Sequence, residues 1–347
     1  LLLRRALRPA IAAAAVGLLR TEPPLSRSPD GADIGPSVAA RESIGRRRAG
    51  MMLAAVVASL LGAGGALRPR PSLGGATAGG SITPDAGRAL YDEAVASVLP
   101  PAGFTSRIAL RDSVLRLVEH GVVDVQKFAS IYDRRGGLPA ELRYALHWPA
   151  HLPIHLTAEN AGYYVNLLWP IGLANHMATN AGSPLNGPSL LTFASTAGWN
   201  LGEAANGGEY FNKLPIVELT PEQEALATRV AKSTYRPCCG NSTFFQDCNH
   251  GSALLGVLEL GAAQGLTEDE LYREALAFNS FWFPDTYIRT ALYFKAVAES
   301  SWAEVDPRIV MGERYSALRS WQANVQAPLA AIPNLIPEQQ GGAQCGA

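Results

Sequence analysis

Residues 251–265, GSALLGVLELGAAQG, form a nearly all-apolar stretch with a single charged residue, Glu259. An apolar run of this length is too long for a typical strand and predicts a helix that is buried rather than amphipathic. Gly265 marks its expected end, because glycine is favoured just past a helix C-terminus. We therefore expect this helix to lie in the core.

Amphipathic helices are predicted on both sides of this stretch. Residues 220–235, TPEQEALATRVAKSTY, begin with Thr220, and Gln223 completes a capping box in which side chain and backbone bond each other reciprocally. Residues 267–283, TEDELYREALAFNSFWF, repeat the same device, and Pro284 is the expected stop. These two helices would flank the buried one in the chain.

Further helices are expected at both ends of the folded region. Asp124 is a candidate N-cap for a helix starting at Val125. Residues 285–302 and 312–325 have amphipathic patterns.

The middle of the chain has a different composition. Residues 147–215 are rich in Asn, Gly, Trp and Pro, and we expect one helix there, near 158–169, set among ordered loops. Strand signals are few, and PIVEL at 215–219 is the best of them. The predicted fold is mainly α: a single irregular helical domain, residues 83–338, with long ordered Asn/Gly-rich loops.

Three of the four cysteines lie within eleven residues, just before the buried helix. Cys238, Cys239, Cys248 and His250 form the pattern C-C-x8-C-x-H. Thiolate and imidazole together suit zinc, copper or iron, although this spacing matches no standard zinc finger. Cys248 and His250 should lie at a helix N-terminus, where unpaired N–H groups favour a thiolate. The first hypothesis is a transition-metal or metal-redox site made of these four residues.

Other residues could complete such a metal shell. Asp247 adjoins Cys248, and His155 stands just before the predicted 158–169 helix. Cys345 lies in the tail GGAQCGA, residues 341–347.

Two alternatives to a metal site remain open. One is a thiol-based enzyme or redox protein in which Cys239 or Cys248 is activated by His250. The other is a disulfide-stabilised binding or scaffold protein of a membrane-associated complex, with Cys238 or Cys239 joined to Cys248. Whether the protein is an enzyme is left open.

A second group of polar residues could line a small-molecule pocket. Asn160, Asn166 and Asn175 accumulate around Trp169 and an apolar helix. Buried amides must be hydrogen-bonded, so these residues form either a pocket or a loop scaffold.

The front of the chain has the composition of a targeting region. Residues 1–80 contain eleven arginines, no lysine and four acidic residues. Arginines precede two short apolar runs, as in signal and transit peptides. We expect 1–66 to be a targeting region, partly untranslated if synthesis starts at Met51 or Met52, followed by a disordered leader at 67–82 and a flexible tail at 339–347.

The composition also limits where the protein is expected to be located and what it is expected to bind. Both apolar runs are shorter than the ~20 residues of a membrane span, so no transmembrane segment is expected in the mature chain. The expected destination is across a membrane, in a thylakoid lumen or, alternatively, outside the cell. A net charge of −1 gives no general attraction to nucleic acid, and no nucleic-acid partner is expected. The identity of a small-molecule or protein partner is left open.

A resemblance to other proteins is carried by FASTAGWNLG at 193–202, by YFNKLPIVELTPEQEALA at 210–227, by residues 235–284, from YRPCCGNSTFFQDCNHGSALLG to NSFWFP, and by GGAQCG near the end. Through these stretches the chain resembles a family of uncharacterised exported bacterial proteins with algal relatives. The most specific part is the stretch R-P-C-C-x-N-S-T-x-F-x-D-C-N-H-G, and the resemblance covers about residues 107–346. It implies one coherent domain and a destination across a membrane, and it assigns no activity or catalytic residue. The arginine-rich leader implies a plastid-bearing alga as host.

Overall fold

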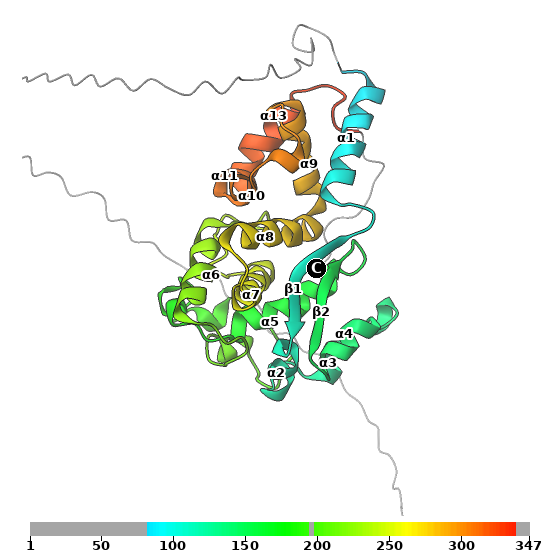
Figure 1. Cartoon of the computed structure of the whole chain (residues 1–347). Helices are drawn as coiled ribbons and strands as arrows, with labels where there is room; N and C mark the ends of the chain where they lie inside the picture. The colour runs from blue at the N-terminus through cyan, green and yellow to red at the C-terminus, as the bar shows by residue number, and fades with distance from the viewer. Residues whose placement is uncertain (1–81, 194–197, 338–347) are drawn as a thin grey trace, which may run out of the picture. The chain divides into compact units, whose positions relative to one another are not determined.

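A computed structural model of the chain describes residues 82–193 and 198–337, all of which belong to one compact unit, Leu73–Ala347. The predictions for residues 1–81 and for the tail at 339–347, including Cys345, lie outside the described residues. The described part is mainly α-helical, as the sequence predicted, and it also contains one two-stranded sheet that the sequence analysis did not predict (Figure 1).

The elements of the first half are α1 (Pro84–Val98), β1 (Phe104–Arg111), α2 (Ser113–Glu119), α3 (Val125–Ser130), α4 (Ala140–Ala145), β2 (Ala150–Leu156) and α5 (Ala161–Ala174). Those of the second half are α6 (Pro221–Ser233), α7 (Asn249–Ala263), α8 (Glu268–Trp282), α9 (Pro284–Ala296), α10 (Pro307–Met311), α11 (Glu313–Ser316), α12 (Leu318–Trp321) and α13 (Ala327–Ala330). Short 3-10 turns interrupt the long loop between α5 and α6, and a π-helical turn, Gln322–Gln326, follows α12.

The buried helix predicted at 251–265 is α7, and it is central to the core. Twelve of its fifteen residues are buried, Gly251 to Ala262 without interruption. Helices α5, α6 and α8 and strand β1 all contact it. Gly265 adopts a left-handed φ of +83° just after the helix, as expected for a glycine at a C-terminal stop.

Helices α5 and α7 approach each other more closely than side chains would allow. A Cβ atom on Gly172 would stand 2.0 Å from the Ser252 carbonyl oxygen, and one on Gly256 would stand 2.6 Å from that of Leu168. Ser252 adds a hydrogen bond from its hydroxyl to the Trp169 carbonyl, at 3.0 Å. The two backbones are therefore in direct contact, and the crossing requires glycine at both positions.

The capping predictions are confirmed. Thr220 and Thr267 each accept from the backbone N–H three residues on, with Gln223 and Glu270 bonding back. Asp124 accepts from the first N–H groups of α3. These bonds are local, and for that reason the sequence alone was sufficient to place them.

The strand prediction at 215–219 was wrong. This segment is irregular, and the buried Asn175 side chain accepts from Val217 N–H at 2.8 Å, in place of a neighbouring strand. The sheet instead pairs β1 with β2, antiparallel and with two register irregularities near Ala109.

Strand β1 is completed on its other edge by side chains rather than by a third strand. Gln264 both accepts from Ala109 N–H, at 3.0 Å, and donates to its carbonyl, at 2.8 Å. The Glu274 carboxylate accepts from Arg107 N–H and from the Ser106 hydroxyl. These long-range bonds satisfy the backbone of a strand that the local sequence did not reveal.

Two predicted helices have different bounds. The helix expected at 158–169 is α5 and continues past Pro170 to Ala174. The helix expected over 312–325 is broken into α11, α12 and a π-helical turn. At the break after Ala317, Leu318 N–H donates to the Cys239 carbonyl at 2.9 Å instead of continuing a helix.

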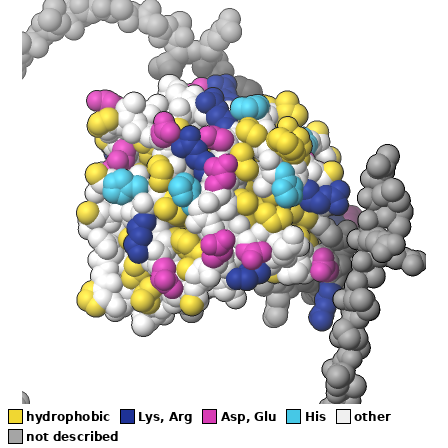
Figure 2. Space-filling model, turned by 90° about the horizontal axis from the view of Figure 1, so that it is seen from below, with side chains coloured by type: hydrophobic (Ala, Val, Ile, Leu, Met, Phe, Trp, Pro, Cys, Tyr) yellow, Lys and Arg dark blue, Asp and Glu magenta, His cyan; other side chains and the backbone are white. Residues whose placement is uncertain are grey.

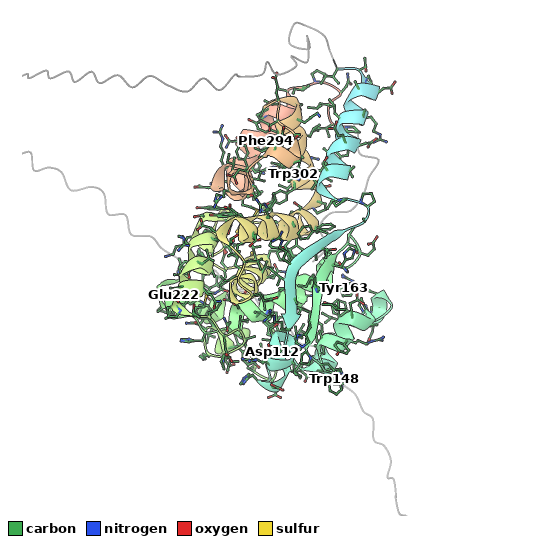
Figure 3. All side chains as sticks on the ribbon, in the orientation of Figure 1. Asp112, Trp148, Tyr163, Glu222, Phe294 and Trp302 are labelled. Carbon is green, nitrogen blue, oxygen red and sulfur yellow. The ribbon has the colours of Figure 1, made fainter. Side chains whose placement is uncertain are left out.

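The described surface includes a few large hydrophobic side chains. Tyr144 on α4 is 54% exposed, Trp148 between α4 and β2 is 60% exposed, and Leu152 on β2 is 85% exposed. Trp148 lies at the edge of the described body (Figure 3). On the face shown in Figure 2, acidic and basic side chains are interspersed, so that face has no patch of a single charge. Among the described residues, no helix has both the length and the apolar character needed to cross a membrane.

The close crossing predicts a strong difference between two glycines of α5. Gly172→Ala should lower the free energy of unfolding by about 2–4 kcal/mol, because the new methyl group meets backbone rather than a movable side chain. Gly162→Ala is the matched control, since nothing lies within 4 Å of its Cβ position. It should be neutral or stabilising by ~0.5–1 kcal/mol. Urea unfolding of the two variants measures the difference, and equal destabilisation would contradict the crossing.

Glu259 predicts a pH dependence of stability. Its carboxyl group is fully buried in α7, and burial raises its pKa well above the ordinary 4.5. The folded state therefore holds this proton more tightly than the unfolded state, so stability falls as pH rises from about 4.5 toward the folded-state pKa. Glu259→Gln should be about 1–3 kcal/mol more stable than the parent at neutral pH and similar to it near pH 4. Urea midpoints across this range test it. The control, Glu119→Gln, changes an exposed carboxyl and should track the parent throughout.

Candidate metal centre

The cysteine loop, residues 236–248, connects α6 to α7 and folds back on itself. Thr234 and Thr243 close its base, with a backbone bond of 2.8 Å and a hydroxyl–hydroxyl bond of 2.9 Å. Both threonines are buried. The loop therefore has a fixed shape before its sulfur atoms are considered.

A buried guanidinium group holds the loop from inside. The Arg236 side chain has no solvent exposure. Its five N–H groups donate to Cys248 Sγ at 3.0 Å, to the carbonyl oxygens of Asn241 at 3.0 Å, Ser242 at 2.7 Å and Phe245 at 2.8 Å, and to the Asp247 carboxylate. Every donor of the group is thus used, which a buried arginine requires.

The guanidinium lies over the first turn of α7, where only glycine fits. A Cβ atom on Gly251 would stand 2.5 Å from the central carbon of the guanidinium. Gly251 N–H also donates to Cys248 Sγ, at 3.3 Å, so that Cys248 is the N-cap of α7 through its sulfur. The predicted placement of Cys248 at a helix N-terminus is confirmed.

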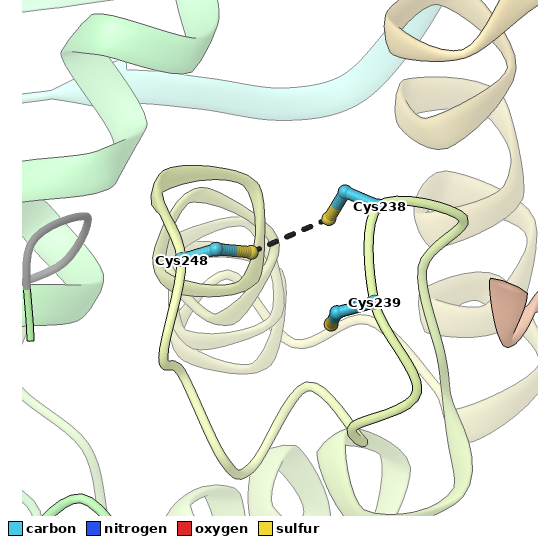
Figure 4. A group of neighbouring side chains, drawn as sticks. All are labelled: Cys238, Cys239 and Cys248. Atoms are coloured by element: carbon cyan, nitrogen blue, oxygen red, sulfur yellow. Dashed lines mark hydrogen bonds between the residues drawn. The ribbon is translucent and has the colours of Figure 1, made fainter.

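The three thiols, Cys238, Cys239 and Cys248, converge on one point and form what we term the three-thiol cluster (Figure 4). Their sulfur atoms all lie within 4.8 Å of one another, and Cys238 Sγ is 3.4 Å from Cys248 Sγ. Zn–S bonds of about 2.3 Å in a tetrahedral site place two sulfurs roughly 3.8 Å apart. The observed spacing therefore fits three ligands of one ion. In the part of the chain that the structure describes, this is the one group of His, Cys, Asp or Glu side chains with such spacing.

Electrostatics single out Cys248 as the thiolate of the cluster. S–H donation from Cys238 and Cys239 lowers the pKa of Cys248, and the adjacent Arg236 guanidinium lowers it further. The pKa of Cys238 is raised, because its thiol is hydrogen-bonded to the other two thiols. One negative charge is thus shared by three sulfurs and centred on the one nearest to the guanidinium.

His250 lies beside the cluster but outside it. Its ring packs against Phe283, with centroids 4.5 Å apart, and edge-on to Trp282 at 6.0 Å. Burial lowers its pKa to about 4, so the imidazole is neutral at pH 7. The cation beside Cys248 is therefore Arg236 and not an imidazolium, which a Cys–His nucleophile of the thiol-protease kind would need.

The proposed supplementary ligands have other contacts. The Asp247 carboxylate accepts from Arg236 and, at 2.8 Å, from the Asn241 side-chain amide. His155 lies on β2, where its Nδ1 is 3.1 Å from the Thr105 hydroxyl. Cys345 is outside the described residues. The structure thus brings together three of the sequence-predicted metal ligands, Cys238, Cys239 and Cys248.

The pocket candidates form part of the scaffold. Asn160 bonds Thr157 N–H and the His155 carbonyl, both at 2.8 Å, and so shapes the turn before α5. The Asn166 amide donates to the Tyr132 hydroxyl at 2.8 Å, and Trp169 packs edge-on against Trp199. The Asn175 side chain accepts from Val217 N–H. The four residues therefore stabilise loops and helix packing.

Sequence reasoning overlooked Arg236 and Gly251. Both flank the cysteines in the stretch R-P-C-C to N-H-G, so their position was visible. The available signal was an arginine at the start of a loop in which the one other charged residue is Asp247, so that the two could pair within the loop. Comparison of the chain with models of protein families, with curated proteins and with solved structures finds no match. The geometry of the cluster is therefore the basis for any functional assignment.

The five bonds of Arg236 predict that lysine cannot replace it. Arg236→Lys keeps the charge but replaces five N–H donors on three nitrogens by three on a single nitrogen, which cannot reach all five acceptors, and should cost about 3–5 kcal/mol in unfolding free energy. The pKa of Cys248 should rise, because the N–H directed at its sulfur is gone. Urea unfolding and ultraviolet thiolate absorbance against pH measure the two effects. Arg229→Lys is the control: its side chain is 59% exposed and pairs with Glu268 at 3.2 Å, so a change within ~0.5 kcal/mol is expected.

Proposed function

We propose that Cys238, Cys239 and Cys248 bind one thiophilic transition-metal ion, with zinc, copper or iron as the candidate ions. The observation on which this rests is the convergence of the three sulfur atoms within 4.8 Å of one another. Soft thiolate ligands select these ions over magnesium or calcium.

Arg236 supports this proposal through charge. Three thiolates around a divalent ion leave one surplus negative charge, which has to be compensated in a partly buried site. The guanidinium already donates to Cys248 Sγ at 3.0 Å and is fully buried, so it supplies that compensation. The N-terminus of α7, with Gly251 N–H directed at the same sulfur, adds to it.

The shell we propose contains three sulfurs and leaves His250 outside. The His250 ring is packed between aromatic side chains, and it is not among the groups within ligand spacing of one another. Three protein ligands leave a coordination position for an exogenous molecule, which is the arrangement of catalytic rather than closed structural sites. Cys238, the exposed member, lies on the side that solvent reaches.

Metal content of the purified full-length chain tests the proposal. After expression in cells supplied with zinc, copper and iron, and purification without chelator, elemental mass spectrometry should find about one ion per chain. Cys248→Ser should reduce the content about tenfold or more, while serine keeps the N-cap of α7 and hence the fold. A metal-free parent protein, or metal that survives Cys248→Ser, would contradict the proposal.

Two histidine variants serve as controls in the same measurement. His155→Ala changes an imidazole on β2 and should leave the metal content unchanged. His250→Phe keeps the aromatic packing against Phe283 and should also retain the metal. Loss of metal in His250→Phe alone would show that the imidazole turns toward the ion and that the shell has four ligands.

A further inference from the structure

Two members of the three-thiol cluster are closer to each other than a shared metal ion requires. Cys238 Sγ and Cys248 Sγ are 3.4 Å apart, and they are the pair joined by the dashed line in Figure 4. Neither takes part in a disulfide bond in the structure. Forming a disulfide bond of about 2.05 Å would require the sulfurs to approach by a further ~1.4 Å.

The surroundings determine which sulfur can move. Cys248 is held as the N-cap of α7 and by Arg236 Nε. Cys239 is tied through its carbonyl to Leu318 N–H, at 2.9 Å. Cys238 is the exposed residue of the three and precedes Gly240 in the turn. The approach would therefore come from Cys238, toward a fixed Cys248.

We propose that Cys238 and Cys248 form a reversible disulfide that excludes the metal, so that metal binding at this site is controlled by the thiol–disulfide balance of its compartment. The inference rests on the proposed function, because it concerns the regulation of the same three-thiol cluster. Oxidation removes two of the three thiolate ligands and leaves Cys239 alone, which is too few ligands for tight binding.

The oxidant is the disulfide of a small thiol, such as oxidised glutathione. Cys238, the exposed thiol, transfers its proton to Cys248 and attacks one sulfur of the small disulfide. That S–S bond breaks, a mixed disulfide forms on Cys238, and one small thiolate leaves and takes up the proton held by Cys248. The Cys248 thiolate then attacks Cys238 Sγ, and the second small thiolate leaves and is protonated from solvent. In total, the Cys238 thiol, the Cys248 thiolate, one small disulfide and one proton from solvent give one protein disulfide and two small thiols.

Oxidation of the full-length, metal-loaded chain tests the inference. Samples are equilibrated with oxidised or reduced glutathione, and two quantities are read from each: metal per chain, by elemental mass spectrometry, and cysteine pairing, by mass spectrometry of a non-reduced digest. With oxidised glutathione we expect a Cys238–Cys248 link and about a tenfold fall in metal content, both reversed by dithiothreitol.

Variants separate the chosen pair from its neighbour. Cys239→Ser should still form the Cys238–Cys248 disulfide, whereas Cys238→Ser should form no internal disulfide in the cluster. Circular dichroism confirms that both variants are folded. A Cys239–Cys248 link in the parent protein, or metal retained in glutathione-oxidised protein, would overturn the inference while the metal site stands. A reduced parent protein without metal would instead overturn the proposed function, and the digest would still report which cysteines pair.

Discussion

The contact between the bare backbones of α5 and α7 is the constraint on which the rest of this structure depends. Gly172 and Gly256 leave no side chain between the helices, and Ser252 bonds across them. This crossing fixes α7, against which α6, α8 and β1 all pack. Since Cys248 is the N-cap of α7, the same contact sets the direction from which its sulfur atom enters the cluster.

The first turn of α7 also has to leave room for the Arg236 side chain. The guanidinium occupies the position that a side chain on residue 251 would take, and it organises the preceding loop through five hydrogen bonds. A buried cation that is fully hydrogen-bonded needs negative charge close by, and here that charge comes from Asp247 and from the thiolate of Cys248. Fold and site are thus coupled: one arginine shapes the loop and also lowers the pKa of the sulfur that it contacts.

The break in the C-terminal helices shows how far the effects of the loop extend. The pattern of 312–325 is helical, yet Leu318 N–H bonds Cys239 and the helix is interrupted there. This long-range bond overrides a local preference, as tertiary contacts commonly do. The strands β1 and β2 were not predicted for a similar reason. The backbone of β1 is hydrogen-bonded by Gln264 and Glu274, which lie more than 150 residues further along the chain.

The sequence by itself determined the helical class, the buried α7, the capping boxes at Thr220 and Thr267, and the neighbourhood of three cysteines and a histidine. All of these depend on interactions within a few residues, or on composition along one element. Only the tertiary structure decided that three sulfurs converge while His250 turns to Phe283, and that Arg236 is the cation of the site. The direction of a side chain depends on what fills the space around it. The cysteine loop and the first turn of α7 are contacted by α5, by the end of α8 and by α12, whose residues are distant in sequence.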